Sequence, residues 1–129
     1  MTKAALGKWY RYVTSPSPAA LLDMLHPDVV FESPVVHTPQ KGRDIAVRYL
    51  TSAVAVLGGP TFRYVGEWLS DDGAIIEFET EIDGITINGV DIIKFTADGA
   101  RILGFKVMVR PLKAINLLHR LMGEQLAKA

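Results

Sequence analysis

Apolar and polar residues alternate with a period of two through the second half of the chain. From Phe62 onward, four such runs are separated by three turn-forming segments that contain Asp and Gly. Between Ile76 and Ile82 the alternate positions are glutamates, so one face of this strand is expected to be dry and the other wet. Consecutive strands that are joined by tight turns predict an antiparallel meander.

Apolar residues at helical spacing indicate two short helices near the start of the chain. The first covers about residues 3–13, and the second begins at Ser17, which can cap it, and ends at residues 26–28. A short strand is predicted at residues 29–33, before a loop that contains prolines and a glycine.

A longer helix is predicted next, with Asp44 in its first turn and a Gly-Gly-Pro segment at its end. Pro111 opens a final helix after the meander. Leu21, Leu22 and Leu25 are the expected buried stripe of the second helix, and Ile45, Tyr49, Ala53 and Val56 make one apolar face of the third. In the last helix, the apolar positions Leu112, Ile115, Leu118 and Met122 pack either on the sheet or on a second subunit.

Together these elements predict one α+β domain over residues 1–129. About three helices from the N-terminal half and a C-terminal helix should lie on a curved antiparallel sheet. A length of 129 residues, of which 49% are hydrophobic, suits a single core. A bent sheet that is closed by helices leaves a cone-shaped cavity, and concave apolar spaces are where small molecules bind.

The charges balance, with 14 basic and 14 acidic residues, so no net field favours a nucleic acid or an anionic membrane as partner. They are segregated: residues 67–98 hold nine acids and one base, whereas residues 101–129 hold six bases and one acid. Cross-strand pairing on the outer face accounts for this pattern. The chain has no cysteine, no signal-like apolar start and no stretch that could span a bilayer, so we expect a soluble, cytoplasmic protein.

Asp91 is the one polar residue on an otherwise apolar strand face. Its alternation partners, Ile87, Gly89, Ile93 and Phe95, point toward the core. Because an unpaired buried carboxylate is costly, such a group is paired, held protonated, or lines a cavity that uses it. A structural acid with hydrogen-bond partners and a cavity acid with a raised pKa both remain open.

The order of the elements resembles that of the nuclear transport factor 2-like superfamily, and most closely its SnoaL-like branch. Three segments carry the resemblance, which covers nearly the whole chain: DVVFESP at 28–34, GRDIAVRYL at 42–50 and GVDIIKF at 89–95. The superfamily includes ketosteroid isomerases, polyketide cyclases, epoxide hydrolases, dehydratases and non-catalytic modules. The resemblance therefore implies a fold and a pocket without fixing a reaction.

Residue by residue, the resemblance places Asp91 where the isomerase has an oxyanion-hole acid, which an apolar site keeps neutral as a hydrogen-bond donor. It places Ser33 where the isomerase has its base, and serine cannot shuttle protons as a carboxylate does. The isomerase's tyrosine donor corresponds to Trp9 or, with a gap, to Tyr12. Helical phase favours Trp9, because Trp9 and Tyr10 belong to the apolar stripe of this helix and Tyr12 points away from it. Gly89 stands in place of the epoxide hydrolase arginine.

Histidines and glutamates supply the remaining candidates. His37 follows the first strand in a loop near the expected mouth of the cavity and can act as a base. Glu32 alternates with Phe31 and Ser33, so it should point away from the cavity. The histidines at 26, 37 and 119 share no metal-ligand spacing, and no glycine-rich phosphate loop occurs, so we expect neither a metal nor a cofactor.

Our first hypothesis is a cofactor-independent lyase, isomerase or cyclase that acts on a mostly apolar small molecule with one polar group. Asp91 is its acid or hydrogen-bond donor, and His37 is the second catalytic candidate. The expected ligand-binding residues are Ser33 and Tyr49, which orient the ligand, one or more of Trp9, Tyr10 and Tyr12 on the first helix, and the apolar walls Phe31, Phe78, Phe105 and Val107. Tyr49 and Trp68 are otherwise predicted to be core aromatics.

Two alternatives belong to other classes of protein. One is a ligand-binding module without turnover, since a cavity with one acid and many apolar groups can bind without reacting. The other is a dimerisation scaffold. The outer face of the sheet mixes Ile92, Ile102 and Met108 with complementary charges, which favours a homodimer through that face.

Overall fold

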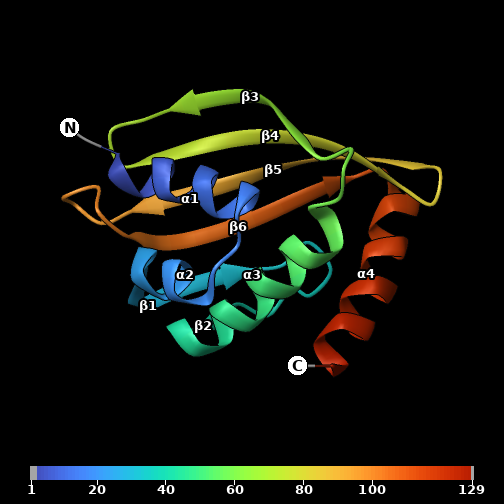
Figure 1. Cartoon of the computed structure of the whole chain (residues 1–129), viewed down its shortest axis with the longest axis horizontal. Coiled ribbons are helices and arrows are strands. Elements are labelled where there is room, and N and C mark those ends of the chain that lie inside the picture. Colours follow the sequence, from blue (N-terminus) through green and yellow to red (C-terminus); the bar gives the residue numbers. More distant parts are fainter. Residues whose placement is uncertain (1–2, 129) are drawn as a thin grey trace.

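The computed structural model describes residues 3–128 (Figure 1). Its helices are α1 (Ala4–Thr14), α2 (Pro18–Met24), α3 (Arg43–Leu57) and α4 (Leu112–Ala127). Its strands are β1 (Leu25–Glu32), β2 (Gln40–Lys41), β3 (Arg63–Leu69), β4 (Gly73–Ile82), β5 (Ile85–Phe95) and β6 (Ile102–Arg110). The predicted α+β class, with helices on a curved and open sheet, is confirmed.

The six strands form one sheet in the order β2-β1-β6-β5-β4-β3. Strands β3 to β6 make the antiparallel meander that the sequence predicts. β1 lies parallel to β6, with Phe31 opposite Phe105, so the sheet is mixed rather than wholly antiparallel. A parallel pair needs a long crossover connection. Here that connection contains α3 and the rest of the meander.

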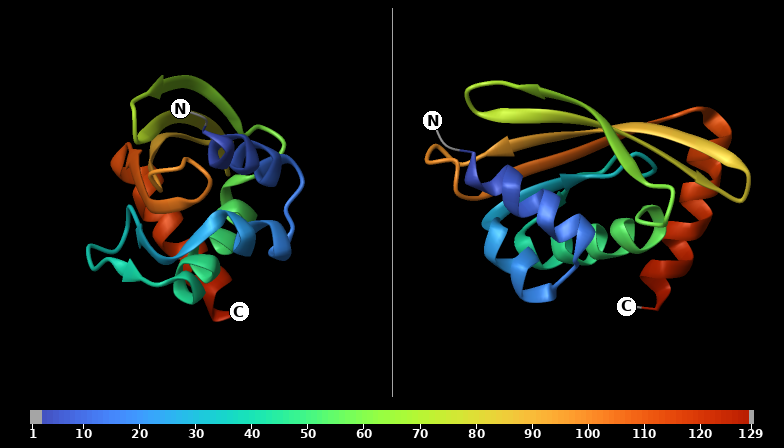
Figure 2. Two further views of the ribbon diagram at one scale, coloured as in Figure 1. Left: turned by 90° about the vertical axis from the view of Figure 1, so that its left-hand side faces the viewer. Right: turned by 45° about the horizontal axis from the view of Figure 1, so that its top comes forward.

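Helices α1, α2 and α3 lie on one side of the bent sheet, and α4 stands at one end of the space that they enclose (Figures 1 and 2). α3 packs on β1 and α4, and α1 packs on α2. Within residues 3–128, no helix covers the outer face of β3–β6. None of the helices in this range is long and apolar enough to cross a membrane.

The inner face of the meander is dry, as the alternation predicts. On β4, Ile76, Phe78 and Thr80 are at most 3% exposed. On β6, Phe105 and Val107 are buried in the same layer. Burial of each large apolar side chain contributes roughly 1.5–3 kcal/mol, so this face supplies a large part of the core.

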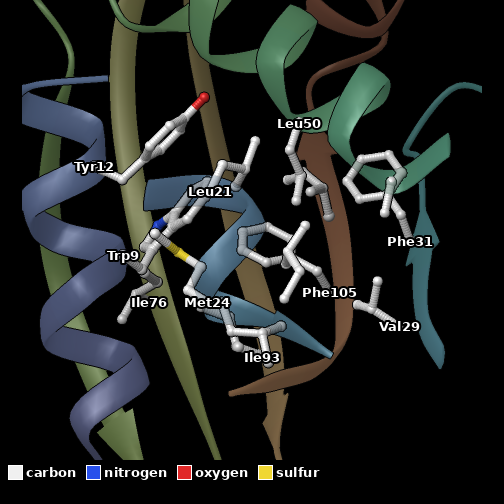
Figure 3. Packing of buried hydrophobic residues seen from close by; sticks show 14 of the residues in the cluster. Trp9, Tyr12, Leu21, Met24, Val29, Phe31, Leu50, Ile76, Ile93 and Phe105 are labelled. Carbon is white, nitrogen blue, oxygen red and sulfur yellow. The ribbon is translucent and has the colours of Figure 1, made fainter. Parts of the chain in front are cut away.

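Helix α1 is buried on two sides, because it lies between the sheet and α2. Tyr12, which apolar spacing directs away from the core, is only 4% exposed and stacks on Trp9, with 5.5 Å between the ring centroids. Figure 3 shows both side chains pointing from α1 into the core. Tyr10, predicted to share the apolar stripe, is only half-buried at its edge. The prediction for Tyr12 is therefore wrong, whereas Tyr10 packs against the edge of the core.

Strand β1 starts earlier than the sequence predicts. Helix α2 ends at Met24, and extended chain begins at Leu25, which pairs with Ile102 on β6. Residues 26–28, predicted to end the helix, lie within the strand instead. Pairing with β6 overrides the weak local preference for helix. Leu22, predicted to be buried, is 43% exposed.

The buried sides of α3 and α4 are rotated from the predicted ones. Because α3 packs on both β1 and α4, its most buried apolar residues are Ala46 and Leu50. The predicted positions in α3 are half-buried: Ile45, Tyr49, Ala53 and Val56. In α4, Leu118 and Met122 are buried as predicted, whereas Leu112, in the first turn, is 72% exposed.

A register shift in β3 changes which of its residues face the core. The shift lies between Tyr64 and Gly66, and an extra residue in one strand alters the alternation of the residues that follow. Trp68 consequently lies opposite Ile75 on the outer face and is 57% exposed. The prediction of Trp68 as a core aromatic is wrong for this reason.

A second shift, where β5 and β6 pair, moves Ile102 to the inner face. The irregularity lies between Lys94 and Phe95, and Ile102 pairs with Phe95 beyond it. Ile102 is 0% exposed, so it does not belong to the outer face where we expected it. Met108 is on the outer face as predicted and is 52% exposed.

Candidate functional site

A cavity lies between the inner face of the sheet and helices α1, α3 and α4. Its volume is about 50 Å³. One water needs roughly 10–15 Å³ by this measure, so the space holds only a few waters or one small molecule. Gly58, which is exposed after the end of α3, belongs to the wall, so the cavity reaches the surface there.

Asp91 lies on β5 in the cavity wall and is 5% exposed. Its sheet neighbours, Ile76 and Val107, are buried and apolar. Loss of water disfavours the charged form of a carboxyl group. Burial therefore raises the pKa of Asp91 from its ordinary value of 3.8 to about 7, although a hydrogen bond from Tyr64 lowers it. The charge of this group changes close to neutral pH.

Tyr64 on β3 connects Asp91 to helix α1. Its hydroxyl donates a hydrogen bond to Oδ2 of Asp91 at 2.7 Å and accepts one from Nε1 of Trp9 at 2.9 Å. Burial, followed by the charge of Asp91, raises the pKa of Tyr64, so this hydroxyl stays protonated. Three elements thus supply one directed hydrogen-bond chain, Trp9–Tyr64–Asp91, which runs from the indole to the carboxyl group.

The second carboxyl oxygen of Asp91, Oδ1, is the one that remains for a ligand. The hydrogen bond from Tyr64 goes to Oδ2, and Oδ1 has no partner among residues 3–128. Every fully buried side-chain nitrogen or oxygen in this range has a hydrogen-bond partner. Oδ1 is therefore not fully buried and keeps contact with the cavity.

A second acid lies beside this hydrogen-bond chain. Tyr10 donates a hydrogen bond to Oε1 of Glu67 at 2.8 Å. Burial, then that hydrogen bond and the charges of Glu67 and Asp91, raise the pKa of Tyr10. Because the charge of Asp91 acts on Tyr10, the two carboxyl groups contribute negative potential to the same region of the molecule.

Six aromatic side chains line the cavity in two clusters. The first cluster contains Trp9, Phe31 and Phe105, and the second contains Phe62, Tyr64 and Phe78. Phe105 lies 4.7 Å from Trp9 and 6.2 Å from Phe31 between ring centroids, and Figure 3 shows these three side chains in a row. In the second cluster, Phe62 lies 5.1 Å from Tyr64 and 5.4 Å from Phe78. The hydrogen bond from Trp9 to Tyr64 joins the two clusters.

The structure brings seven of the ten predicted site residues to this cavity. They are Trp9, Phe31, Ser33, Phe78, Asp91, Phe105 and Val107. Ser33 follows β1, and its Oγ accepts the backbone N–H of Val35 at 3.1 Å, which leaves its hydroxyl hydrogen free to donate. That these residues contact a ligand stays a prediction.

The other three predicted site residues do not line the cavity. Tyr12 is buried behind Trp9. The half-buried ring of Tyr49 packs on Phe31 at 5.6 Å, and Asp91 takes its hydroxyl partner from Tyr64 rather than from Tyr49. His37 is exposed in a separate surface depression beyond the end of β1. Any contact of these three with a ligand remains a prediction.

Tyr64 is the site residue that the sequence reading misses. It belongs to the first strand of the meander, at the edge of the sheet, where the alternation is interrupted by the register shift. One signal could have found it: a buried acid needs a hydroxyl partner, and Tyr64 is an aromatic with a polar tip on a neighbouring part of the sheet.

Gly89 shapes the wall beside Asp91. A Cβ atom at this position would lie 2.5 Å from Cζ of Phe78 and 2.6 Å from the carbonyl oxygen of Met108. Contacts below 3 Å do not occur at real Cβ atoms, so the ring of Phe78 occupies the place of a side chain. An arginine at this position, two residues before the aspartate, would therefore clash with the ring of Phe78 and the backbone of β6.

The polar groups of the cavity are few. Within residues 3–128, no three His, Cys, Asp or Glu side chains come together in a way that could hold a metal ion. The cavity wall offers one carboxyl group and the hydroxyls of Ser33 and Tyr64. Magnesium and calcium sites need several oxygen ligands, so the chemistry available here is hydrogen bonding and proton transfer.

Residues 6–104 match the family model of the SnoaL-like domain. This range includes the strand that carries Asp91 and most of the cavity wall. The chain belongs to the SnoaL-like domain family, and the resemblance inferred from its sequence is confirmed. Comparison with curated proteins gives no match.

Solved structures place the fold among nuclear transport factor 2-like proteins. A steroid delta-isomerase from Pseudomonas aeruginosa is 31% identical over 97% of this chain and 90% of that one, with a TM-score of 0.87. A protein with a cystatin-like fold from Silicibacter pomeroyi DSS-3 is 23% identical over 96% and 86%, with a TM-score of 0.86. A nuclear transport factor 2-like protein from Cytophaga hutchinsonii is 12% identical over 85% and 90%, with a TM-score of 0.62. The chain is a pocket protein of this superfamily.

Proposed function

We propose that the cavity binds a small, mostly apolar molecule with one polar group, and that Asp91 exchanges a proton with that group. The observation that carries this proposal is the placement of a single carboxyl group in a cavity wall that is otherwise almost wholly apolar. General acids and bases work best when their pKa lies near the working pH, and the pKa of Asp91 is about 7. The reaction class that fits is a cofactor-independent isomerisation, elimination or cyclisation.

The size of the cavity restricts the substrate. Pockets for drug-sized ligands are roughly 300–1,000 Å³ in volume. The present cavity is about 50 Å³, so it suits a molecule of a few non-hydrogen atoms. A substrate as large as the steroid in the name of the Pseudomonas aeruginosa protein requires side chains of the wall to move.

Proton shuttling of the steroid-isomerase type is not part of this proposal. Ser33 stands where the resemblance places the base of ketosteroid isomerases, and its hydroxyl is a poor base at neutral pH. Asp91 is then the one wall residue that can take up or release a proton near neutral pH, and Ser33 supplies a hydrogen-bond donor.

Binding to the cavity can be measured by two-dimensional NMR on protein labelled with 15N. Trp9 lines the cavity and Trp68 is exposed on the outer face, so the two indole N–H signals report on the two places separately. We expect 1-butanol, 2-butanone or n-butylamine to shift the Trp9 signal and leave that of Trp68 in place. If none of the three moves the Trp9 signal while the fold is intact, the proposal fails.

The second candidate function is a binding module without turnover. It is favoured because the wall residues include no Lys, Arg, His, Glu or second Asp side chain, and the hydroxyl of Tyr64 stays protonated. The two functions separate on one variant. Asp91→Asn should abolish turnover of a substrate that the wild type converts, whereas in a binding module it changes affinity and no turnover exists to lose.

We also propose that two copies of the chain pack through the outer face of the sheet. Trp68, Ile75 and Met108 are 57%, 38% and 52% exposed on that face, on three different strands. The outward residues of β4 include Glu77, Glu79 and Glu81, whereas those of β6 include Lys106 and Arg110. A two-fold axis between two such faces brings the acidic strand of each copy toward the basic strand of the other.

The oligomeric state is tested by light scattering at micromolar concentration. We expect twice the 14.2 kDa mass of one chain for the wild type and the single-chain mass for Met108→Glu. Leu112→Glu is the matched control, because Leu112 is 72% exposed on α4 and lies off the sheet. A wild-type mass of one chain contradicts the proposal.

A further inference from the structure

The cavity contains one potential negative charge and no positive one. Asp91 lines it, and no Lys, Arg or His residue is among its wall residues. Every ion pair found within residues 3–128 lies elsewhere, at exposed or half-exposed side chains. A buried carboxylate without a counter-charge is unfavourable, and a ligand that brings a positive charge offsets part of that cost.

The direction of the hydrogen bonds also favours a ligand that donates. The indole N–H of Trp9 is given to Tyr64, and the hydroxyl hydrogen of Tyr64 is given to Asp91. Both donors are consumed inside the Trp9–Tyr64–Asp91 chain, and an ionised carboxylate only accepts. In its ionised form, Asp91 therefore presents the acceptor Oδ1 at this end of the cavity.

The walls suit a cation as well. Six aromatic rings line the cavity, among them four of the five phenylalanines of the chain. The negative faces of aromatic rings attract cations, and desolvated sites strengthen this attraction. A primary alkylammonium group places its N–H donors on the carboxylate and its alkyl part among the rings.

We propose that the polar group of the ligand is an amine, bound as an ammonium ion that donates a hydrogen bond to Oδ1 of Asp91. This inference rests on the proposed function of the cavity and adds the chemical class of the substrate. An alcohol offers a hydrogen bond without the charge, and a ketone offers neither to an ionised carboxylate. The inference therefore predicts that the cavity binds an amine more tightly than an alcohol or a ketone of the same size.

The pH dependence of binding follows from the groups that surround Asp91. From β3 and α1 these are Tyr64, Tyr10 and Glu67, the last two joined by a hydrogen bond. The residues that β4, β6, α3 and α4 contribute to the cavity wall are not titratable. The carboxyl group of Asp91 must lose its proton to pair with an ammonium ion. Its pKa of about 7 therefore makes amine binding strongest in mildly alkaline solution.

The experiment compares n-butylamine with 1-butanol and 2-butanone, which have the same number of non-hydrogen atoms. Binding is followed by the indole N–H signal of Trp9, with that of Trp68 as the internal control. At about pH 8.5 we expect the amine to bind at least about ten-fold more tightly than either neutral molecule, because a desolvated charge pair adds to the apolar contacts. Between about pH 8.5 and pH 5.5 its affinity should fall roughly 30-fold, as Asp91 takes up its proton.

Two variants complete the test. Asp91→Asn keeps the size of the side chain and removes its charge, so the amine should lose its advantage and its pH dependence. Glu81→Gln removes an exposed charge on the outer side of β4, away from the cavity, and should leave amine binding unchanged. Should Asp91→Asn not fold, the wild-type pH series decides alone.

The outcomes separate this inference from the proposed function. Equal binding of all three molecules, or amine binding that ignores pH, overturns the amine inference and leaves the cavity as a small-molecule site. Movement of the Trp68 signal alone places the amine on surface carboxylates and also overturns it. No binding by any of the three overturns the proposed function together with the inference.

Discussion

The two faces of the meander are made by alternate residues of the same strands, yet they treat charge in opposite ways. The outer face holds acids and bases that pair in water, such as Arg63 with Glu79 at 2.7 Å. The buried part of the inner face holds one acid, Asp91, with apolar neighbours and a single hydrogen bond from Tyr64. Burial raises the pKa of Asp91, whereas solvent screens the charges of the exposed carboxyl groups on the outer face.

The largest expected difference between the faces is in packing. Ile75 and Ile76 are neighbours on β4, the first 38% exposed on the outer face and the second 0% exposed on the inner one. Ile76→Ala should lower the free energy of unfolding by roughly 2–5 kcal/mol, because it leaves a cavity. Ile75→Ala should cost about 1 kcal/mol or less. Urea unfolding measures both. A cost for Ile75→Ala that grows with protein concentration indicates a partner on the outer face.

The next effect is on the pH dependence of stability. Between pH 4 and 7 the folded protein keeps the proton of Asp91 while the unfolded chain has lost it, so stability falls as the pH rises through this range. A pKa raised from 3.8 to about 7 corresponds to at most roughly 4 kcal/mol at about 1.4 kcal/mol per unit. Asp91→Asn should remove this dependence and should be the more stable protein above pH 7.

The control for that comparison is an outer-face acid. Glu81→Gln should leave the pH profile of stability close to that of the wild type, since Glu81 is exposed. Equal pH profiles for the wild type and Asp91→Asn, measured by urea unfolding at several pH values, contradict a desolvated Asp91.

A smaller effect is expected from the hydroxyl of Tyr64. Tyr64→Phe leaves the indole N–H of Trp9 and one oxygen of Asp91 without their hydrogen bonds, which should cost roughly 1–3 kcal/mol for each buried group. It should also raise the pKa of Asp91 further, because the lost bond stabilises the carboxylate. Urea unfolding and an NMR titration of the Asp91 carboxyl group measure the two effects. Trp68→Phe, on the outer face, should leave this pKa unchanged.

The smallest effect belongs to an outer-face ion pair. Arg63 and Glu79 lie 2.7 Å apart with side chains that are 63% and 37% exposed. Exposed pairs contribute about 0–1 kcal/mol and are screened by salt. Glu79→Gln should therefore lower stability by no more than about 1 kcal/mol at low ionic strength. At high salt the two proteins should unfold at the same urea concentration, and a large difference there points to a buried role for Glu79.

Much of the fold could be predicted because its strongest signals are local. The alternation from Phe62 onward and the Asp-Gly turns define the meander, and they place Asp91 on the inner face without any knowledge of its partners. The parallel pairing of β1 with β6 could not be predicted in the same way. It joins residues far apart in the chain, and neither strand carries a local mark of it.

The missed hydrogen-bond partner of Asp91 and the exposed position of Trp68 have one physical cause. Strict alternation would put Tyr64 and Trp68 on the same face of β3. The register shift between Tyr64 and Gly66 separates the two, so Tyr64 reaches Asp91 while Trp68 is exposed. The energy of an irregular strand depends on its partner strand, which a reading of single segments does not contain.

The predicted buried side of helix α1 is wrong for a related reason. A single apolar stripe predicts one buried side, but α1 is covered by both the sheet and α2, so Tyr12 is buried as well as Trp9. The wall residues that lie on strands could be predicted more directly. Phe31, Phe78, Phe105 and Val107 follow directly from the parity of their strands.

The hydrogen bond between Trp9 and Tyr64 joins helix α1 to the edge strand β3. A ligand larger than the cavity would have to displace wall residues, and an outward movement of α1 would break the hydrogen bond between Trp9 and Tyr64. The pKa of Asp91 depends on its hydrogen bond from the same hydroxyl. A change in the position of α1 would therefore act on this pKa through two hydrogen bonds, Trp9–Tyr64 and Tyr64–Asp91. Under the proposed function, the size of the ligand and the proton affinity of Asp91 would therefore be coupled through the hydroxyl of Tyr64.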